Sequence, residues 1–167
     1  MSAQGEALAL VEEFHREKLA AMLQHMAHAR RVGQYDANNT YQYVISREDV
    51  QLNWLRDAIS ELGGGTVEDV PEPAIHASGK PADAQAAVIR EDRDGAQAFV
   101  DHWRDKVEKV TTNARNRNML RVILGETLEA KRFFDQMIAG REDLLGRRPD
   151  DAGTPGQVIA TRWVGPE

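Results

Sequence analysis

The chain has 167 residues, a formal net charge of −6 and no cysteine. With 41% hydrophobic residues, a chain of this length can bury one core, so a single domain is expected. The acidic balance argues against nucleic acid or an anionic membrane as a partner. Without cysteine there is no disulfide, thiolate metal site or cysteine nucleophile, so any metal must be bound by oxygen and imidazole.

The sequence contains neither a run of about 18 apolar residues nor a leader with a charged and then an apolar stretch. We therefore expect no membrane span and no secretion signal. A cytoplasmic location is expected.

The first predicted element is one long helix from Gly5 to Val32, because apolar residues recur there at intervals of three and four. His15 and Lys18 lie on the apolar face of this helix. Lys18 is expected either to extend its charge to the surface or to pair with an inward acid. His25 and His28 fall nearer the helix end, at the edge of the face, and are interpreted as hydrogen-bonded core residues rather than metal ligands. The apolar face consists of Leu8, Val11, Phe14, Leu19, Met22, Met26, Ala29 and Val32.

Residues 33–40 predict a short turn, after which a second helix returns antiparallel to the first. Two polar residues, Glu48 and Gln51, fill the gap in its apolar stripe at helical spacing. An ionisable group held out of water is costly unless it is paired or bound to a metal, so Glu48 needs a partner. The apolar positions of the stripe are Tyr41, Val44, Leu52, Leu55, Ile59 and Leu62.

The glycines at 63–65 end the second helix, and the Pro- and Gly-rich residues 66–81 predict a connection long enough to traverse a bundle. A third helix is predicted from Ala82 to about Thr112, with Asp92 on its inward stripe. After a short turn, a fourth helix runs to about Leu145. The chain is therefore predicted to be all-α, with two antiparallel helical hairpins joined by one long crossover.

The fourth helix repeats the pattern of the second, because Glu126 and Glu129 match Glu48 and Gln51. Glu48 and Glu126 are predicted to be the two most buried acids, since each is at the middle of an apolar stripe. Carboxylates that face one another in a core are tolerable when they are protonated, matched to buried cations or bound to metal ions. The stripe on the fourth helix is predicted to contain Met119, Val122, Ala130, Phe133 and Met137.

Two hairpins, inward acids on helices two and four and the ELGGG end of helix two resemble the ferritin-like superfamily, of the rubrerythrin or bacterioferritin kind. The resemblance covers about residues 5–145. It implies a ferritin-like antiparallel four-helix bundle for residues 1–145 and a di-metal carboxylate site inside it. Residues 146–167 are expected to form an extended tail, in which 158–164 can dock on the bundle or on a neighbouring subunit.

The resemblance also implies a set of metal ligands, with departures from the family pattern. Gln51 and Glu129 stand where the family has histidines, and His15 stands where helix one has a glutamate. His15 precedes Glu48 by 33 residues, close to the 34 residues from Asp92 to Glu126. The implied set fits a single iron or manganese ion better than a redox-cycling pair. Its members are His15, Glu48, Gln51, Asp92, Glu126 and Glu129.

Two interpretations of function follow. In the preferred one, the variant carboxylate and histidine site binds iron or manganese and acts in oxygen, peroxide or metal handling. In the alternative no metal is bound: His15, Lys18 and an arginine such as Arg93 neutralise the acids, and the bundle is a dimerisation or interaction module. A homodimer is expected, because a large aromatic residue at the bundle edge suits a two-fold partner. The candidates are Phe14, Trp54, Trp103 and Phe134.

Overall fold

The computed structural model describes residues 2–65, 69–76 and 78–146. This described part is helical and contains no strand, which confirms the predicted all-α class. Most of the predicted tail, residues 147–167, lies outside it. The elements are α1 (Ala3–Ala29), α2 (Tyr35–Glu61), α3 (Pro81–Glu108), α4 (Ala114–Ile138) and the short 3-10 helix η1 (Leu144–Gly146).

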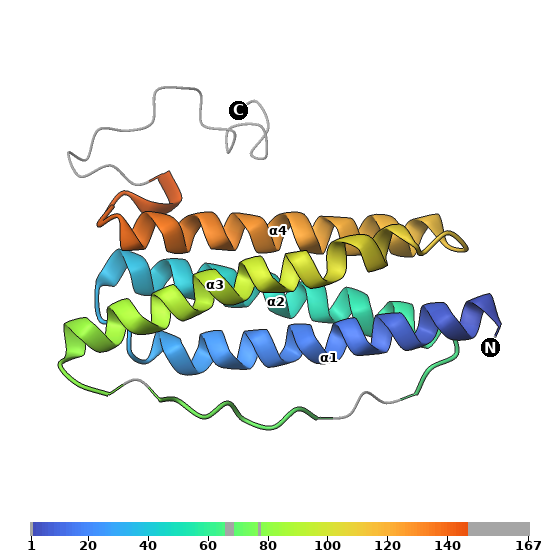
Figure 1. Ribbon diagram of the computed structural model, residues 1–167, viewed down its shortest axis with the longest axis horizontal. Coiled ribbons are helices and arrows are strands. Elements are labelled where there is room, and N and C mark those ends of the chain that lie inside the picture. The colour runs from blue at the N-terminus through green and yellow to red at the C-terminus, as the bar shows by residue number, and fades with distance from the viewer. Residues whose placement is uncertain (1, 66–68, 77, 147–167) are drawn as a thin grey trace, which may run out of the picture.

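The four long helices lie side by side as two hairpins (Figure 1). α1 packs antiparallel to α2, and α3 packs antiparallel to α4. The connection from α2 to α3 follows the length of the bundle, so α3 starts at the end opposite to the one where α2 stops. As a result α2 and α3 point in one direction, and α1 and α4 point in the other. In the part of the chain that the structure describes, no helix is long and apolar enough to cross a membrane.

The two largest differences from the predicted helix boundaries are at the start of α2 and at the end of α4. α2 begins at Tyr35 rather than near residue 41, because polar side chains cap it. The Gln34 side chain accepts a hydrogen bond from the Ala37 amide, and the Asn38 side chain donates to two carbonyls at the end of α1. α4 ends at Ile138 rather than near residue 145, and Gly140, at φ 78°, supplies the left-handed residue that follows many helices.

The core consists of two apolar clusters, one towards each end of the bundle. On every helix the residues of one cluster are separated from those of the other by a buried polar residue. These separating residues are Lys18 and His25 on α1, Glu48 on α2, Asp92 on α3 and Thr127 on α4. The bundle therefore has a polar waist between two apolar ends. The first cluster includes Val11, Phe14, Leu55, Trp103 and Ile123, and the second includes Val32, Tyr41, Val88, Phe133 and Phe134.

The inward face of α4 is rotated relative to the predicted one. Val122, predicted to be in the core, is 49% exposed, whereas Leu120, Ile123 and Thr127 are buried. This rotation moves Glu126 to the edge of the bundle, so the prediction that it is one of the two most buried acids was wrong. Asp92 takes that place beside Glu48, with exposed fractions of 1% and 2%.

Candidate functional site

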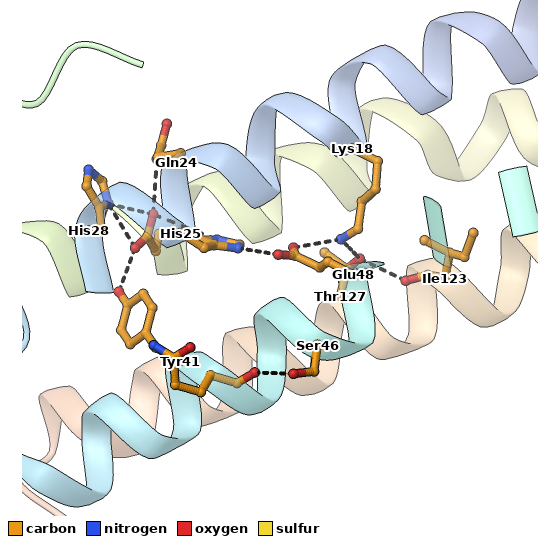
Figure 2. A network of polar contacts seen from close by, with 11 residues as sticks. Lys18, Gln24, His25, His28, Tyr41, Ser46, Glu48, Ile123 and Thr127 are labelled. Carbon is orange, nitrogen blue, oxygen red and sulfur yellow. Dashed lines mark hydrogen bonds and ion pairs between the residues drawn. The ribbon is translucent and has the colours of Figure 1, made fainter. Parts of the chain in front are cut away.

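The carboxylate of Glu48 lies at the centre of the polar waist (Figure 2). Lys18 Nζ donates a hydrogen bond to Oε1 at 3.1 Å, and His25 Nδ1 lies 2.9 Å from Oε2. Lys18 also donates to Thr127 Oγ1 at 3.3 Å, which extends the contact to α4. Both oxygens of Glu48 are thus occupied by nitrogen atoms of α1.

The carboxylate of Asp92 reaches the first hairpin from α3. His28 Nδ1 lies 2.9 Å from both of its oxygens, and the Tyr41 hydroxyl donates to Oδ2 at 2.5 Å. The Gln24 side chain donates to Oδ1 at 3.0 Å. These three partners come from α1 and α2, so the acid on α3 is satisfied across the seam between the hairpins (Figure 2).

His25 links the two acids into one network, because its Nε2 lies 3.8 Å from Asp92 Oδ1. Lys18, His25 and His28 share one face of α1, since they are seven and then three residues apart. We call this the charge network. Its members are Lys18, Gln24, His25, His28, Tyr41, Glu48, Asp92 and Thr127.

Attraction between opposite charges determines the protonation states of the side chains in the charge network. Burial alone would lower the pKa of His25, but the neighbouring Glu48 and Asp92 outweigh burial and raise it above 6.5. Burial would raise the pKa of Glu48, yet His25 and Lys18 lower it to about 2. Burial, together with the charge of Asp92, raises the pKa of Tyr41, so its hydroxyl remains a donor. At neutral pH Glu48 is therefore ionised.

Glu126 and Glu129, both predicted ligands, lie at the α2–α4 surface and outside the charge network. Glu126 is 21% exposed at its side chain and pairs with Arg47, while the Gln51 side chain donates to its other oxygen. Glu129 is 40% exposed, and Arg132 lies 3.9 Å from it. These acids are thus matched to arginines near solvent.

His15 is buried, and among the described residues neither of its ring nitrogens has a hydrogen-bond partner. Burial, followed by the nearby Arg56 and Arg16, lowers the pKa of His15, so the imidazole is neutral at neutral pH.

Four of the six predicted ligands, Glu48, Gln51, Glu126 and Glu129, line one pocket together with Lys18, whereas His15 and Asp92 do not line it. The six do not form one cluster of ligand atoms. Within the described ranges, the one group of three or more His, Asp or Glu side chains with ligand atoms all within 4.8 Å of one another is Glu13, Glu17 and His102. A metal ion that bound both oxygens of Glu48 would have to displace both Lys18 and His25. As arranged, the predicted set does not fit the carboxylate metal site that the resemblance implies.

Sequence reasoning missed His25 and His28, which are buried and contact both acids of the waist. Their spacing from Lys18 was the available signal, because it places all three on one face of α1. Arg93, suggested as a partner of Asp92, contacts Asp94 instead. No protein-family model, curated protein or solved structure matches this chain, so the functional argument starts from these contacts.

Proposed function

We propose that this chain is a ferritin-like bundle in which the charge network takes the place of a metal centre, and that it acts as a metal-independent dimerisation module. The observation that carries the proposal is the double occupation of Glu48 by Lys18 and His25. The opposed directions of the helices and the long connection between the hairpins agree with the ferritin-like arrangement.

The charge balance of the waist supports a metal-free core. Two carboxylates, Glu48 and Asp92, meet the ammonium of Lys18 and an imidazole, His25, whose pKa is raised. A divalent cation would add two charges to a balanced, buried space and would remove the hydrogen bonds of Lys18. Stranding a buried ammonium without its partner is strongly unfavourable.

The exposed side chains on the outer side of α2 and α4 favour a second copy of the chain as the partner. Tyr43 and Val50 on α2, and Val122 and Leu128 on α4, are large apolar side chains with substantial exposure. The Arg47–Glu126 ion pair lies among them. A surface that contains apolar groups and both signs of charge can meet its own copy across a two-fold axis, because each charge then faces its opposite.

A second candidate, iron or manganese handling, is favoured by His15 alone. Its neutral imidazole has two unpartnered nitrogens, and the Oε1 atom of Gln51, a predicted ligand on α2, is also unpartnered in the described structure. A divalent ion bound to His15, with Gln51 and Glu126 completing the site, is the corresponding hypothesis.

Thermal unfolding with and without metal separates the two candidates. Untagged protein is freed of metal with a chelator and measured alone, with Mn²⁺ and with anaerobic Fe²⁺. We expect each metal to affect the unfolding temperature of the wild type and of His15→Gln equally, because no metal binds at His15. A ligand that binds only the native state raises that temperature. A rise that His15→Gln abolishes would establish the metal-handling function instead.

Sedimentation velocity tests the dimer. We expect the wild type to sediment as a dimer and Val122→Glu as a monomer, because the new carboxylate would lie unpaired in the interface. Met26→Glu is the matched control, since Met26 is similarly exposed but lies on α1. A monomeric wild type at about 100 μM, where even weak self-association is populated, would contradict the proposal.

A further inference from the structure

A second set of titratable side chains lies on the surface where α1 meets α3, outside the charge network. Glu13 and Glu17 are four residues apart on α1, so they share one face, and His102 faces them from α3. One ligand atom of each lies within 4.8 Å of those of the other two. His102 Nε2 is 3.6 Å from Glu17 Oε1.

We propose that Glu13, Glu17 and His102 form a binding site for a borderline divalent metal ion of the zinc class. One imidazole nitrogen and two carboxylate oxygens are zinc ligands, and a water molecule completes a four-coordinate site. Ligand bonds of about 2.0–2.2 Å in tetrahedral geometry place neighbouring ligand atoms about 3.3 Å apart. The three side chains are exposed or half-exposed, so rotation about their own bonds can close the remaining gap.

The imidazole already presents a lone pair to this space. Lys106 Nζ lies 2.9 Å from His102 Nε2 and 3.8 Å from Glu13 Oε1. An ammonium group can only donate, so Nε2 is the acceptor and the ring proton is on Nδ1. The tautomer that this contact with Lys106 requires is also the one that binds a metal through Nε2.

Glu17 is held in a suitable orientation by the buried Trp103, whose indole N–H donates to Oε2 at 2.7 Å. This contact occupies one carboxylate oxygen and leaves Oε1 on the side of His102. A fixed contact to the non-ligating atom of a ligand is the usual way in which proteins orient metal ligands.

Lys106 is the competitor for the site. Its ammonium lies between His102 and Glu13, and it also lies 4.7 Å from the centre of the Trp103 ring. Exchange of this single charge for a divalent ion neutralises both carboxylates, while the lysine can extend into water. The bound ion would then tie α1 to α3, and so one hairpin to the other.

Isothermal titration of untagged protein with Zn²⁺, and with Mg²⁺ as a hard-cation control, tests the site. We expect one equivalent of Zn²⁺ to bind and Mg²⁺ not to bind. Because His102 supplies the nitrogen ligand, His102→Ala should weaken Zn²⁺ binding at least tenfold. His76→Ala is the matched control, since His76 is exposed in the connection between the hairpins. Lys106→Met should tighten binding, because it removes the competing cation.

Thermal unfolding provides a second measurement in the same proteins. Zn²⁺ should raise the unfolding temperature of the wild type and of Lys106→Met, but not that of His102→Ala. Absence of Zn²⁺ binding by the wild type would overturn the proposal. Unchanged binding by His102→Ala would overturn it too, and would identify an adventitious ion only. Loss of binding in His15→Gln with retention in His102→Ala would assign the metal to the core instead.

Discussion

Lys18 is the one lysine among the buried residues of the described structure, and its ammonium balances Glu48. We expect Lys18→Met to lower the free energy of unfolding by about 3–5 kcal/mol, because it leaves a buried carboxylate short of a partner. The double variant Lys18→Met/Glu48→Gln should recover part of this loss. Urea denaturation measures all three proteins.

Arg115→Met is the matched control for that comparison. Arg115 pairs with Glu61 in an exposed position, where ion pairs contribute little. Equal losses in Lys18→Met and Arg115→Met would show that burial of the Lys18–Glu48 pair has no special role.

His25 gives the network a pH dependence of defined sign. Its pKa is raised in the folded state, so its contribution to stability is complete below pH 6.5 and is lost as the pH rises through the raised pKa. The free energy of unfolding of the wild type minus that of His25→Gln should therefore shrink between pH 6.5 and 9. A difference that stays constant over this range would contradict the assignment.

His15 and Glu48 act in other pH windows and do not obscure this test. The lowered pKa of His15 reduces stability as the pH falls below 6.5, because the unfolded chain then takes up the proton more readily. Glu48, with a pKa of about 2, contributes stability above pH 4.5 that disappears as the pH falls towards 2. His25, His15 and Glu48 therefore change the free energy of unfolding in three different pH ranges.

Some of these residues follow from sequence and others do not. Glu48 and Asp92 interrupt apolar stripes, so their burial could be predicted from one helix at a time. The roles of His25 and His28 depend on what the neighbouring helices place opposite them, which a periodic pattern does not contain. Glu126 was misplaced because an error of one position turns a side chain by about 100° around a helix.

At the scale of elements, two of the three glycines after α2, Gly63 and Gly64, have distinct roles. Gly63 has φ 87°, and the amides of Gly63 and Gly64 donate to the carbonyls of Ser60 and Ile59 at the helix end. A Cβ atom on Gly64 would lie 2.5 Å from Ile59 Cγ2 and 2.8 Å from Leu8 Cδ1. Gly64 therefore allows α1 and the end of α2 to approach closely.

We expect Gly64→Ala to lower the free energy of unfolding by about 1–3 kcal/mol, because the branched Ile59 side chain must shift to admit the new methyl group. Gly65→Ala is the matched control, since a Cβ atom at Gly65 has open space around it. Chemical denaturation of both variants gives the comparison. A loss at Gly65 as large as at Gly64 would show that the close contact of the new methyl group with Ile59 and Leu8 is not the cause of the loss at Gly64.

The helices themselves were predictable, whereas their ends were not. Apolar periodicity identified all four, because each buries one face against its neighbours. Residues such as Asn38 are common both in turns and in the first turn of helices, so residues 35–40 were taken for a turn. Only the contacts of Asn38 with the end of α1 distinguish the two.

For the whole molecule, the question is whether the two apolar clusters on either side of the waist unfold together in one cooperative transition. Leu55 belongs to one cluster and Phe133 to the other. We expect Leu55→Ala and Phe133→Ala each to cost about 2–5 kcal/mol, as core truncations do. Because all four helices pass through both clusters, each variant should still unfold in one transition.

Circular dichroism and tryptophan fluorescence provide the two probes for this test. Trp103 lies in the same cluster as Leu55 and Trp54 packs against it, so the fluorescence of these two of the three tryptophans reports on that end. The circular dichroism of the helices reports on all four of them. Separate transitions by the two probes in Phe133→Ala would show that the ends of the bundle unfold independently.

The polar waist also has a consequence for how the two halves of the chain find each other. Apolar side chains tolerate sliding, and a displacement of one helical turn, about 5.4 Å, would still bury much of the same surface. Asp92 does not tolerate it, because its hydrogen-bonding partners within the described residues belong to the other hairpin. A misaligned bundle would therefore enclose a bare carboxylate on one side and an excess of positive charge on the other. The charge network thus favours one register between the two hairpins, because it makes wrongly assembled bundles unstable during folding.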